Sequence, residues 1–567
     1  MNHSLANPPV PLPPMPFSIP DAPHLRLENG LQVVLLPIAR VPIASLRLAV
    51  FSGEADDPSE KFGLTSALAS MMTEGSARYS SRELAEKAER LGLDISVGSS
   101  ADFLLASVSG LSIYLDDIFE LAGEIVLRPT FPENELDLYR RNTIENLKFQ
   151  RSQPNFLAAE RTALELYGEH PYARIAPLPE VVRDISAEDL RRLHSRNVIP
   201  NNAMLFVIGD YNEFDVRKKI EEVFGEWPAS EKQDAQHTPP NPRRQRTISV
   251  IDRPGSAQTN IVLADLAVRR NHPDYFPLLV MNQILGAGAS SRVFMNLREA
   301  KGYTYGAYTR LDLKKNAGEF EATAEVRTQV TGPAIKEFLA EFERIRTERV
   351  APSELEDAKS YLTGVFPIRS ETLDGLTSLI VNQYLYDLPK DYLQTYRENV
   401  AAVSVDDVFR VATQYIRPER MAIVLVGDAA EVIPQVSVFS EALTIFDADG
   451  NRLEKAKFTN AESISPDEIA GKWDITLDFQ GQEIPVTLHL KNDAGSITGT
   501  LETMLGNGII SSAEINGCRL TAVAISELQG GSIELSINGV IEAGTMSGTI
   551  GGPILPVPMQ FRATKAV

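Results

Sequence analysis

Cysteine and histidine are scarce in this chain of 567 residues, which contains one cysteine and seven histidines. A single thiol, Cys518, excludes a disulfide framework and a cysteine-based zinc cluster within one chain. No two histidines are three or four positions apart, so the local signature of a helical metal site is missing, although distant positions could still combine. The seven are His3, His24, His170, His194, His237, His272 and His489.

Long apolar runs and long basic runs are also absent. No segment has the ~18 consecutive apolar residues of a membrane span. The net charge of −21, from 76 acidic and 55 basic residues, argues against nucleic acid as the main partner. Neither the G-x-S-x-G elbow nor a phosphate-binding or dinucleotide-binding glycine motif occurs, so the sequence gives no support for a serine hydrolase or a nucleotide enzyme.

The opening segment, MNHSLANPPVPLPPMPFSIPDAP, is rich in proline and lacks the basic and apolar regions of a signal peptide. Because proline fixes φ, we expect an extended arm over residues 1–19. Such an arm could follow a removed targeting sequence. We therefore favour the bacterial periplasm, as a processed form, over the cytoplasm.

An internal duplication organises the chain. ISAEDLRRLHSRNVIPNNAMLFVIGD, residues 185–210, aligns without a gap with VSVDDVFRVATQYIRPERMAIVLVGD, residues 403–428. Each copy indicates a capped helix, a proline turn and a buried strand that ends in Gly-Asp. The offset of 218 residues, from 185 to 403, predicts two similar domains rather than a short solenoid repeat.

The order of predicted elements indicates an α+β class, in which each half has a mixed or antiparallel sheet covered by helices. We place the first domain at 20–230, a polar linker at 231–246 and the second domain at 247–436. Residues 94–110 are expected to form one strand of the first domain.

The pattern of apolar and polar residues changes after the second domain. We expect a further linker at 437–468 and an all-β barrel- or sandwich-like domain at 469–567, because short alternating strands there are separated by Gly and Asn-Gly turns. A structural or adhesive role is the simplest expectation for this C-terminal domain.

The stretch GLTSALASMMTEGS, residues 63–76, predicts a helix with an unusual face. Ser66, Ala69 and Ser70 share one side of that helix, and the other positions are apolar. Small residues on one face ordinarily let a neighbouring backbone pack closely, which is the structural interpretation of this pattern.

The stretch ILGAGASSRVFMNLREAKGYTYGAY, residues 284–308, has the strongest functional character. It contains an unshielded glycine-rich loop, a helix whose last turn carries Arg298, and a strand that carries Tyr305. Both side chains can donate hydrogen bonds to a carbonyl or an oxyanion. The alternative is a helix-capping arginine and a half-buried tyrosine. The loop, in which either serine can cap the helix, consists of Gly286, Ala287, Gly288, Ala289, Ser290 and Ser291.

LGAGASSRVFMNLREAKGYTYGAY is similar to the signature of the second domain of insulinase-like (pitrilysin-clan) zinc metallopeptidases, which include mitochondrial processing peptidase. The resemblance covers about 20–436 and implies two homologous α/β-sandwich halves of the processing-peptidase type. In that family the first domain carries the inverted zinc motif H-x-x-E-H on a helix. The residues that match the surroundings of that motif are Gly63, Leu64, Met71, Gly75 and Ser76.

By this resemblance, the metal-binding residues themselves are replaced. Ser66 and Ser70 stand at the two histidine positions, Ala69 at the general-base position and Asn146 at the third-ligand position, while Glu145 lies about 100° around the helix from it. Hydroxyls and an amide are poor zinc ligands, and no base remains to deprotonate a metal-bound water. We expect this chain to bind no metal, and unusual ligands are the alternative.

Two-chain members of the family divide their work between a zinc-bearing subunit and a subunit with the glycine loop. The resemblance implies that this chain is inactive alone and forms a heterodimer with a homologous subunit that holds zinc. Arg298 and Tyr305 would then act in trans on the partner's site, and the 286–291 loop would bind a peptide or an unfolded polypeptide. The alternative is a catalytically inert peptide-binding or assembly protein, as a homodimer or a structural subunit.

Overall fold

A computed structural model gives the fold of the chain. It describes residues 19–20, 22–231, 237–455, 458, 464–479, 482–493, 496–503, 506–516, 518–528, 531–542, 544–552 and 559–566. The arm expected over 1–19 lies outside these residues except for residue 19, and so does part of the linker expected at 231–246.

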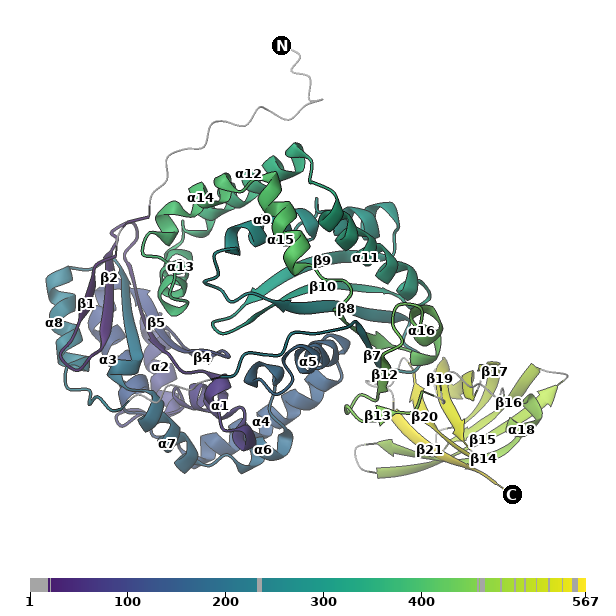
Figure 1. The fold of residues 1–567 in the computed structure, drawn as a ribbon. Helices are drawn as coiled ribbons and strands as arrows, with labels where there is room; N and C mark the ends of the chain where they lie inside the picture. The colour runs from purple at the N-terminus through teal and green to yellow at the C-terminus, as the bar shows by residue number, and fades with distance from the viewer. Residues whose placement is uncertain are drawn as a thin grey trace, which may run out of the picture.

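The first half is built on a mixed six-stranded sheet with the order β1-β2-β6-β3-β5-β4, in which only β2 and β6 pair in parallel (Figure 1). Its strands are β1 (His24–Arg26), β2 (Gln32–Pro37), β3 (Ile43–Val50), β4 (Asp94–Ser99), β5 (Leu104–Leu111) and β6 (Ala203–Gly209). Its helices are α1 (Leu64–Met71), α2 (Ser81–Leu91), α3 (Leu115–Leu127), α4 (Glu133–Arg151), α5 (Pro154–Tyr167), α6 (Pro179–Asp184), α7 (Ala187–Asn197) and α8 (Glu213–Phe224).

The second half repeats this design. Its seven-stranded sheet has the order β13-β12-β7-β11-β8-β10-β9, and the part from β7 to β9 follows the path of β2 to β4 in the first sheet. Its strands are β7 (Thr247–Asp252), β8 (Gln258–Ala267), β9 (Thr304–Leu313), β10 (Gly318–Arg327), β11 (Ala422–Gly427), β12 (Leu443–Phe446) and β13 (Arg452–Leu453). Its helices are α9 (Tyr275–Leu285), α10 (Arg292–Phe294), the π-helical turn η6 (Met295–Ala300), α11 (Thr331–Thr347), α12 (Pro352–Arg369), α13 (Leu373–Leu385), α14 (Tyr392–Ala402), α15 (Val405–Tyr415) and α16 (Ala429–Val436). The predicted fold class of the two halves is confirmed.

Each half contributes one helix to the sheet of the other half. Helix α5 packs on β8 and β11, and its counterpart α13 packs on β3 and β6 (Figure 1). Leu157 of α5 shares a buried cluster with Val424 of β11, and Ile380 of α13 shares another with Phe206 of β6. This reciprocal exchange buries apolar surface of both halves at one interface, which favours a fixed arrangement of the two sheets.

Two segments differ from the sequence expectation. Residues 94–110 form two strands, β4 and β5, because the chain turns between Ser100 and Phe103, where the Ser100 amide donates to the Phe103 carbonyl at 2.8 Å. Residues 443–453, which the sequence placed in a linker, add β12 and β13 to the second sheet, and β12 pairs in parallel with β7.

The C-terminal part is a closed antiparallel barrel, which is one of the two alternatives, a barrel or a sandwich, that the sequence predicted. A short helix, α18 (Pro466–Ile469), packs against β15, and the buried indole of Trp473 donates to the Ile469 carbonyl at 2.9 Å. In the described residues, no helix is both long and apolar enough to cross a membrane. The strands are β14 (Gly471–Phe479), β15 (Gln482–Asp493), β16 (Ser496–Thr503), β17 (Gly506–Asn516), β18 (Arg519–Leu528), β19 (Gly531–Glu542), β20 (Thr545–Gly551) and β21 (Met559–Lys565).

Candidate functional site

Helix α1 begins at a buried carboxylate. Asp57 accepts hydrogen bonds from the amides of Gly63, at 2.9 Å, and Thr65, at 3.1 Å, and from the Thr65 hydroxyl at 2.6 Å. Gly63 has φ +96°, a conformation that favours glycine, and it starts the helix. Burial outweighs these hydrogen bonds and raises the pKa of Asp57 to about 6. The hydrogen bonds to Asp57 therefore hold the first turn of α1 in place, and with it the residues that α1 presents on its small-residue face.

The small-residue face of α1 is only partly exposed. Ala69 is buried, Ser66 is half-buried, and Ser70 is exposed and donates its hydroxyl proton to the Ser66 carbonyl at 3.1 Å. The fourth position, Asn146, is exposed on α4, a helix that packs against α1. The structure thus brings the two helices together and leaves Ser70 and Asn146 exposed at the surface.

Tyr139 on α4 was not singled out from the sequence, yet it belongs to this face. Burial raises the pKa of its hydroxyl, against hydrogen bonds with Thr143 and Ser66. Tyr139 lies seven positions before Asn146, which is about two helical turns, so both lie on the same side of α4. That spacing is the signal that could have identified it.

These residues do not fit a zinc ion. Two serine hydroxyls, one amide and a tyrosine hydroxyl replace the imidazole and carboxylate ligands that zinc prefers. Across the described part of the chain, no three His, Cys, Asp or Glu side chains are close enough to hold a metal ion. The α1–α4 face therefore lacks the donor set that a zinc site needs.

The glycine-rich loop leaves α9 and touches β9. The Thr309 amide donates to the Gly286 carbonyl at 2.9 Å, and a Cβ at position 286 would lie 2.4 Å from Thr309 Oγ1. Position 286 therefore requires glycine because β9 of the same domain leaves no room there for a side chain. Gly288 is different, because a Cβ there would meet only the end of the Gln283 side chain, at 3.0 Å.

The remainder of the loop is mostly open to solvent. Ala287, Ala289 and Ser290 are exposed, and Ser291 is buried. Helix α10 starts after Ser291, whose hydroxyl makes no capping bond and has no hydrogen-bond partner among the described residues. The surface that the loop presents outward is thus formed by small side chains and backbone.

Arg298 and Tyr305 lie at the corner that joins η6 to β9. Arg298 lies in the π-helical turn, its guanidinium carbon 4.9 Å from the centre of the Phe294 ring and its Nε 3.6 Å from a Glu299 oxygen. Tyr305 is 91% exposed on the edge strand β9. No hydrogen bond or ion pair in the described residues joins either side chain to the α1–α4 face. Both are free to contact another molecule.

The fold and these sites define a class: a two-domain peptidase scaffold whose metal-binding face lacks metal ligands. Residues 33–175 match the family model described as "Insulinase (Peptidase family M16)", and residues 184–362 match "Peptidase M16 inactive domain". The chain belongs to the insulinase family, peptidase family M16. The resemblance drawn from the two motifs is confirmed.

Relatives in bacteria carry different descriptions. The chain is 22% identical over 355 residues to the "Uncharacterized zinc protease YmxG" of Bacillus subtilis, covering 62% of this chain and 85% of that protein. It is also 22% identical over 375 residues to the "Non-peptidase homolog YmxG" of Helicobacter pylori, covering 65% and 85%.

Solved structures match the two halves together. A peptidase M16 inactive domain from Pseudomonas fluorescens superposes with a TM-score of 0.68 and 25% identity, covering 72% of this chain and 98% of that chain. The first half of the periplasmic protease PqqL from Escherichia coli gives a TM-score of 0.61 at 16% identity, covering 74% and 95%, which supports the fold alone.

Proposed function

We propose that this chain is the non-catalytic subunit of a heteromeric zinc metallopeptidase. One observation carries the proposal: the α1–α4 face lacks metal ligands, while Arg298 and Tyr305 are exposed in the second half, and the contacts of Arg298 are a surface ion pair with Glu299 and the Phe294 ring. In the proposed complex a homologous partner holds zinc, and this chain supplies hydrogen-bond donors and a loop that contacts peptide. Alone, the chain does not cleave.

The structural alternative for the two donors has little support in their surroundings. A capping arginine donates to helix carbonyls, but the contacts of Arg298 are the Phe294 ring and the Glu299 carboxylate. Tyr305 buries almost none of its ring. An oxyanion donor needs an N–H or O–H that is accessible to a reacting carbonyl, and the exposure of both side chains supports such a role.

The chemistry assigned to this chain is limited to its own residues. The guanidinium of Arg298 and the hydroxyl of Tyr305 would donate hydrogen bonds to the oxygen that gains negative charge when a peptide carbonyl is attacked. The removal of one such donor costs roughly 2.7–4 kcal/mol of barrier, or about 10²–10³ in turnover. The exposed backbone of the 286–291 loop would pair with the extended substrate.

The test uses the chain mixed with a zinc-bearing M16 relative, with a fluorogenic peptide as substrate. Tyr305→Phe and Arg298→Ala should each lower turnover by about 10²-fold while the complex stays intact by light scattering. Tyr308→Phe, on the same strand, and Arg90→Ala, exposed on α2, serve as matched controls. Unchanged turnover in both test variants would refute the proposed role. A homodimer that captures no metallopeptidase would favour an assembly protein instead.

A further inference from the structure

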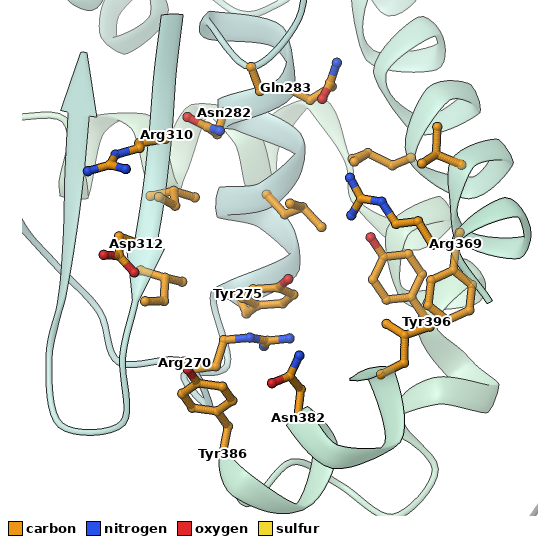
Figure 2. Close-up of a pocket in the computed structure, with 18 of the residues that line it drawn as sticks. Arg270, Tyr275, Asn282, Gln283, Arg310, Asp312, Arg369, Asn382, Tyr386 and Tyr396 are labelled. Atoms are coloured by element: carbon orange, nitrogen blue, oxygen red, sulfur yellow. The ribbon is translucent and has the colours of Figure 1, made fainter. Parts of the chain in front are cut away.

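A second site lies in the second half, beside the glycine-rich loop, whose Ala287 lines it, and neither Arg298 nor Tyr305 is among its lining residues. A cavity of about 590 Å³, partly open to solvent, is lined by α9, β9, α12, α13, α14 and the loops next to them. That volume is in the range of small-molecule sites. Figure 2 shows that side chains from several of these elements point into one space, with Arg270 and Arg369 entering from different walls.

Arg270 is positioned in this cavity without a carboxylate partner among the residues that the structure describes. Its guanidinium carbon lies 3.7 Å from the centre of the Tyr275 ring, and its Nη2 donates to the Tyr392 hydroxyl at 2.7 Å. Its Nη1 is buried and has no hydrogen-bond partner among the described residues. A buried guanidinium nitrogen with no acceptor is costly, so the site is prepared for an acceptor from outside the chain.

Arg369 supplies a second uncommitted charge. It lies at the end of α12, is exposed, and makes no ion pair within the described part of the chain. The other charged residues of the cavity have partners: Arg310 pairs with Glu321 at 2.6 Å, and Asp312 pairs at 2.8 Å with Lys314, which also pairs with Glu319 at 3.3 Å. Two free guanidinium groups in a chain with a net charge of −21 make the cavity locally positive.

Aromatic rings form the rest of the wall. Phe366 and Tyr396 stack with ring centres 4.1 Å apart and an interplanar angle of 10°, and Tyr275 lies over Arg270. Because these ring faces are occupied by each other and by Arg270, the apolar surface left for a ligand consists of ring edges and aliphatic side chains such as Leu279, Leu311 and Leu362. Such a surface can pack against an aromatic or large aliphatic group, while guanidinium groups bind a carboxylate through paired N–H donors.

We propose that this cavity binds a carboxylate attached to an aromatic or large apolar group, with the carboxylate held by Arg270 and attracted by the positive charge of Arg369. The ligand can be a free organic acid or the C-terminal residue of a peptide, which share this chemistry. The site belongs to this chain alone and goes beyond the proposed function. Binding in this cavity needs no zinc-bearing partner. The binding test can therefore fail while the turnover test succeeds, or succeed while the turnover test fails.

Calorimetric titration of the full chain tests the proposal with two pairs of probes. The first pair is N-acetylphenylalanine and its amide, and the second is a short peptide ending in phenylalanine with a free or an amidated C-terminus. We expect each acid to bind at least about tenfold more tightly than its amide. Binding of both acids would indicate a free acid or a peptide end, and binding of the peptide acid alone would indicate a peptide end.

Arginine variants connect the binding to the cavity. Arg369→Gln, at an exposed position, should weaken binding of the acid by about tenfold without loss of folding, and Arg90→Gln should not. Arg270→Gln should abolish the preference for acid over amide, with circular dichroism as the check on folding. The proposal is wrong if acids and amides bind equally, if none of the four probes binds, or if Arg369→Gln binds the acid as the wild type does.

Discussion

The substitution Gly286→Ala separates a structural glycine from a functional one. A Cβ at position 286 would lie 2.4 Å from Thr309 Oγ1 and 2.6 Å from the Thr309 amide nitrogen. Thr309 is 3% exposed, and its hydroxyl donates to Asn282 at 2.8 Å, so it cannot move freely. Overpacking costs about 1–3 kcal/mol and a disturbed hydrogen bond about 1 kcal/mol, so we expect a loss of about 2–4 kcal/mol in the free energy of unfolding.

Gly288→Ala is the matched control in the same loop. Its Cβ would contact only the flexible end of Gln283, so the free energy of unfolding should change by less than about 0.5 kcal/mol. Urea unfolding followed by far-ultraviolet circular dichroism measures both variants under the same conditions. Equal stability of the two variants would refute the assignment of Gly286 to the contact with Thr309. If Gly288→Ala lowered the turnover of the mixed complex without lowering the stability of the chain, the result would indicate that the loop contacts substrate at Gly288.

Three further predictions follow from the described contacts. Burial raises the pKa of the Asp57 carboxyl from 3.8 to about 6, so the folded protein holds this proton at pH values where the unfolded chain has lost it. The free energy of unfolding of the wild type should therefore fall by up to about 3 kcal/mol, relative to Asp57→Asn, as the pH rises from 4 to 7. Urea titrations at each pH measure this change. Arg47 of β3 donates to the Ser378 hydroxyl of α13 at 3.0 Å and forms an ion pair with Asp374 of the same helix. Arg47→Ala should therefore increase amide hydrogen exchange in α13. Unchanged exchange would show that this link between the two halves is dispensable. Because the α1–α4 face does not fit zinc, EDTA should leave the unfolding temperature unchanged, and one zinc per chain after dialysis would contradict this expectation.

Much of the architecture could be predicted because it depends on local patterns. The two aligned segments at 185–210 and 403–428 correspond to α7 with β6 and to α15 with β11, so the duplication identified both central strands. Those strands are buried along their whole length, which is why they appear as continuous apolar runs. The alternation after residue 469 likewise predicted the β domain.

The remaining features depend on contacts between distant residues. The turn that divides β4 from β5 contains Asp102, which accepts from the Lys315 amide of the other half at 3.0 Å. The exchange of α5 and α13 between sheets, the contact of Tyr139 with Ser66 and the packing of Thr309 on Gly286 are of the same kind. Periodicity along one segment contains no information about such partners, so the sequence could not predict them.

The exposure of the Arg298 and Tyr305 corner limits what these two residues can do. A side chain contributes to stability by burying surface or by pairing in a desolvated place, and Tyr305, at 91% exposure, does neither. Arg298 has one ring contact and an exposed ion pair, which together are worth little. The fold would lose almost nothing without them. Since the chain itself lacks a metal-binding face, a chemical role for these two donors requires a reacting carbonyl that another subunit positions, and the turnover of a mixed complex is where their effect would be measured.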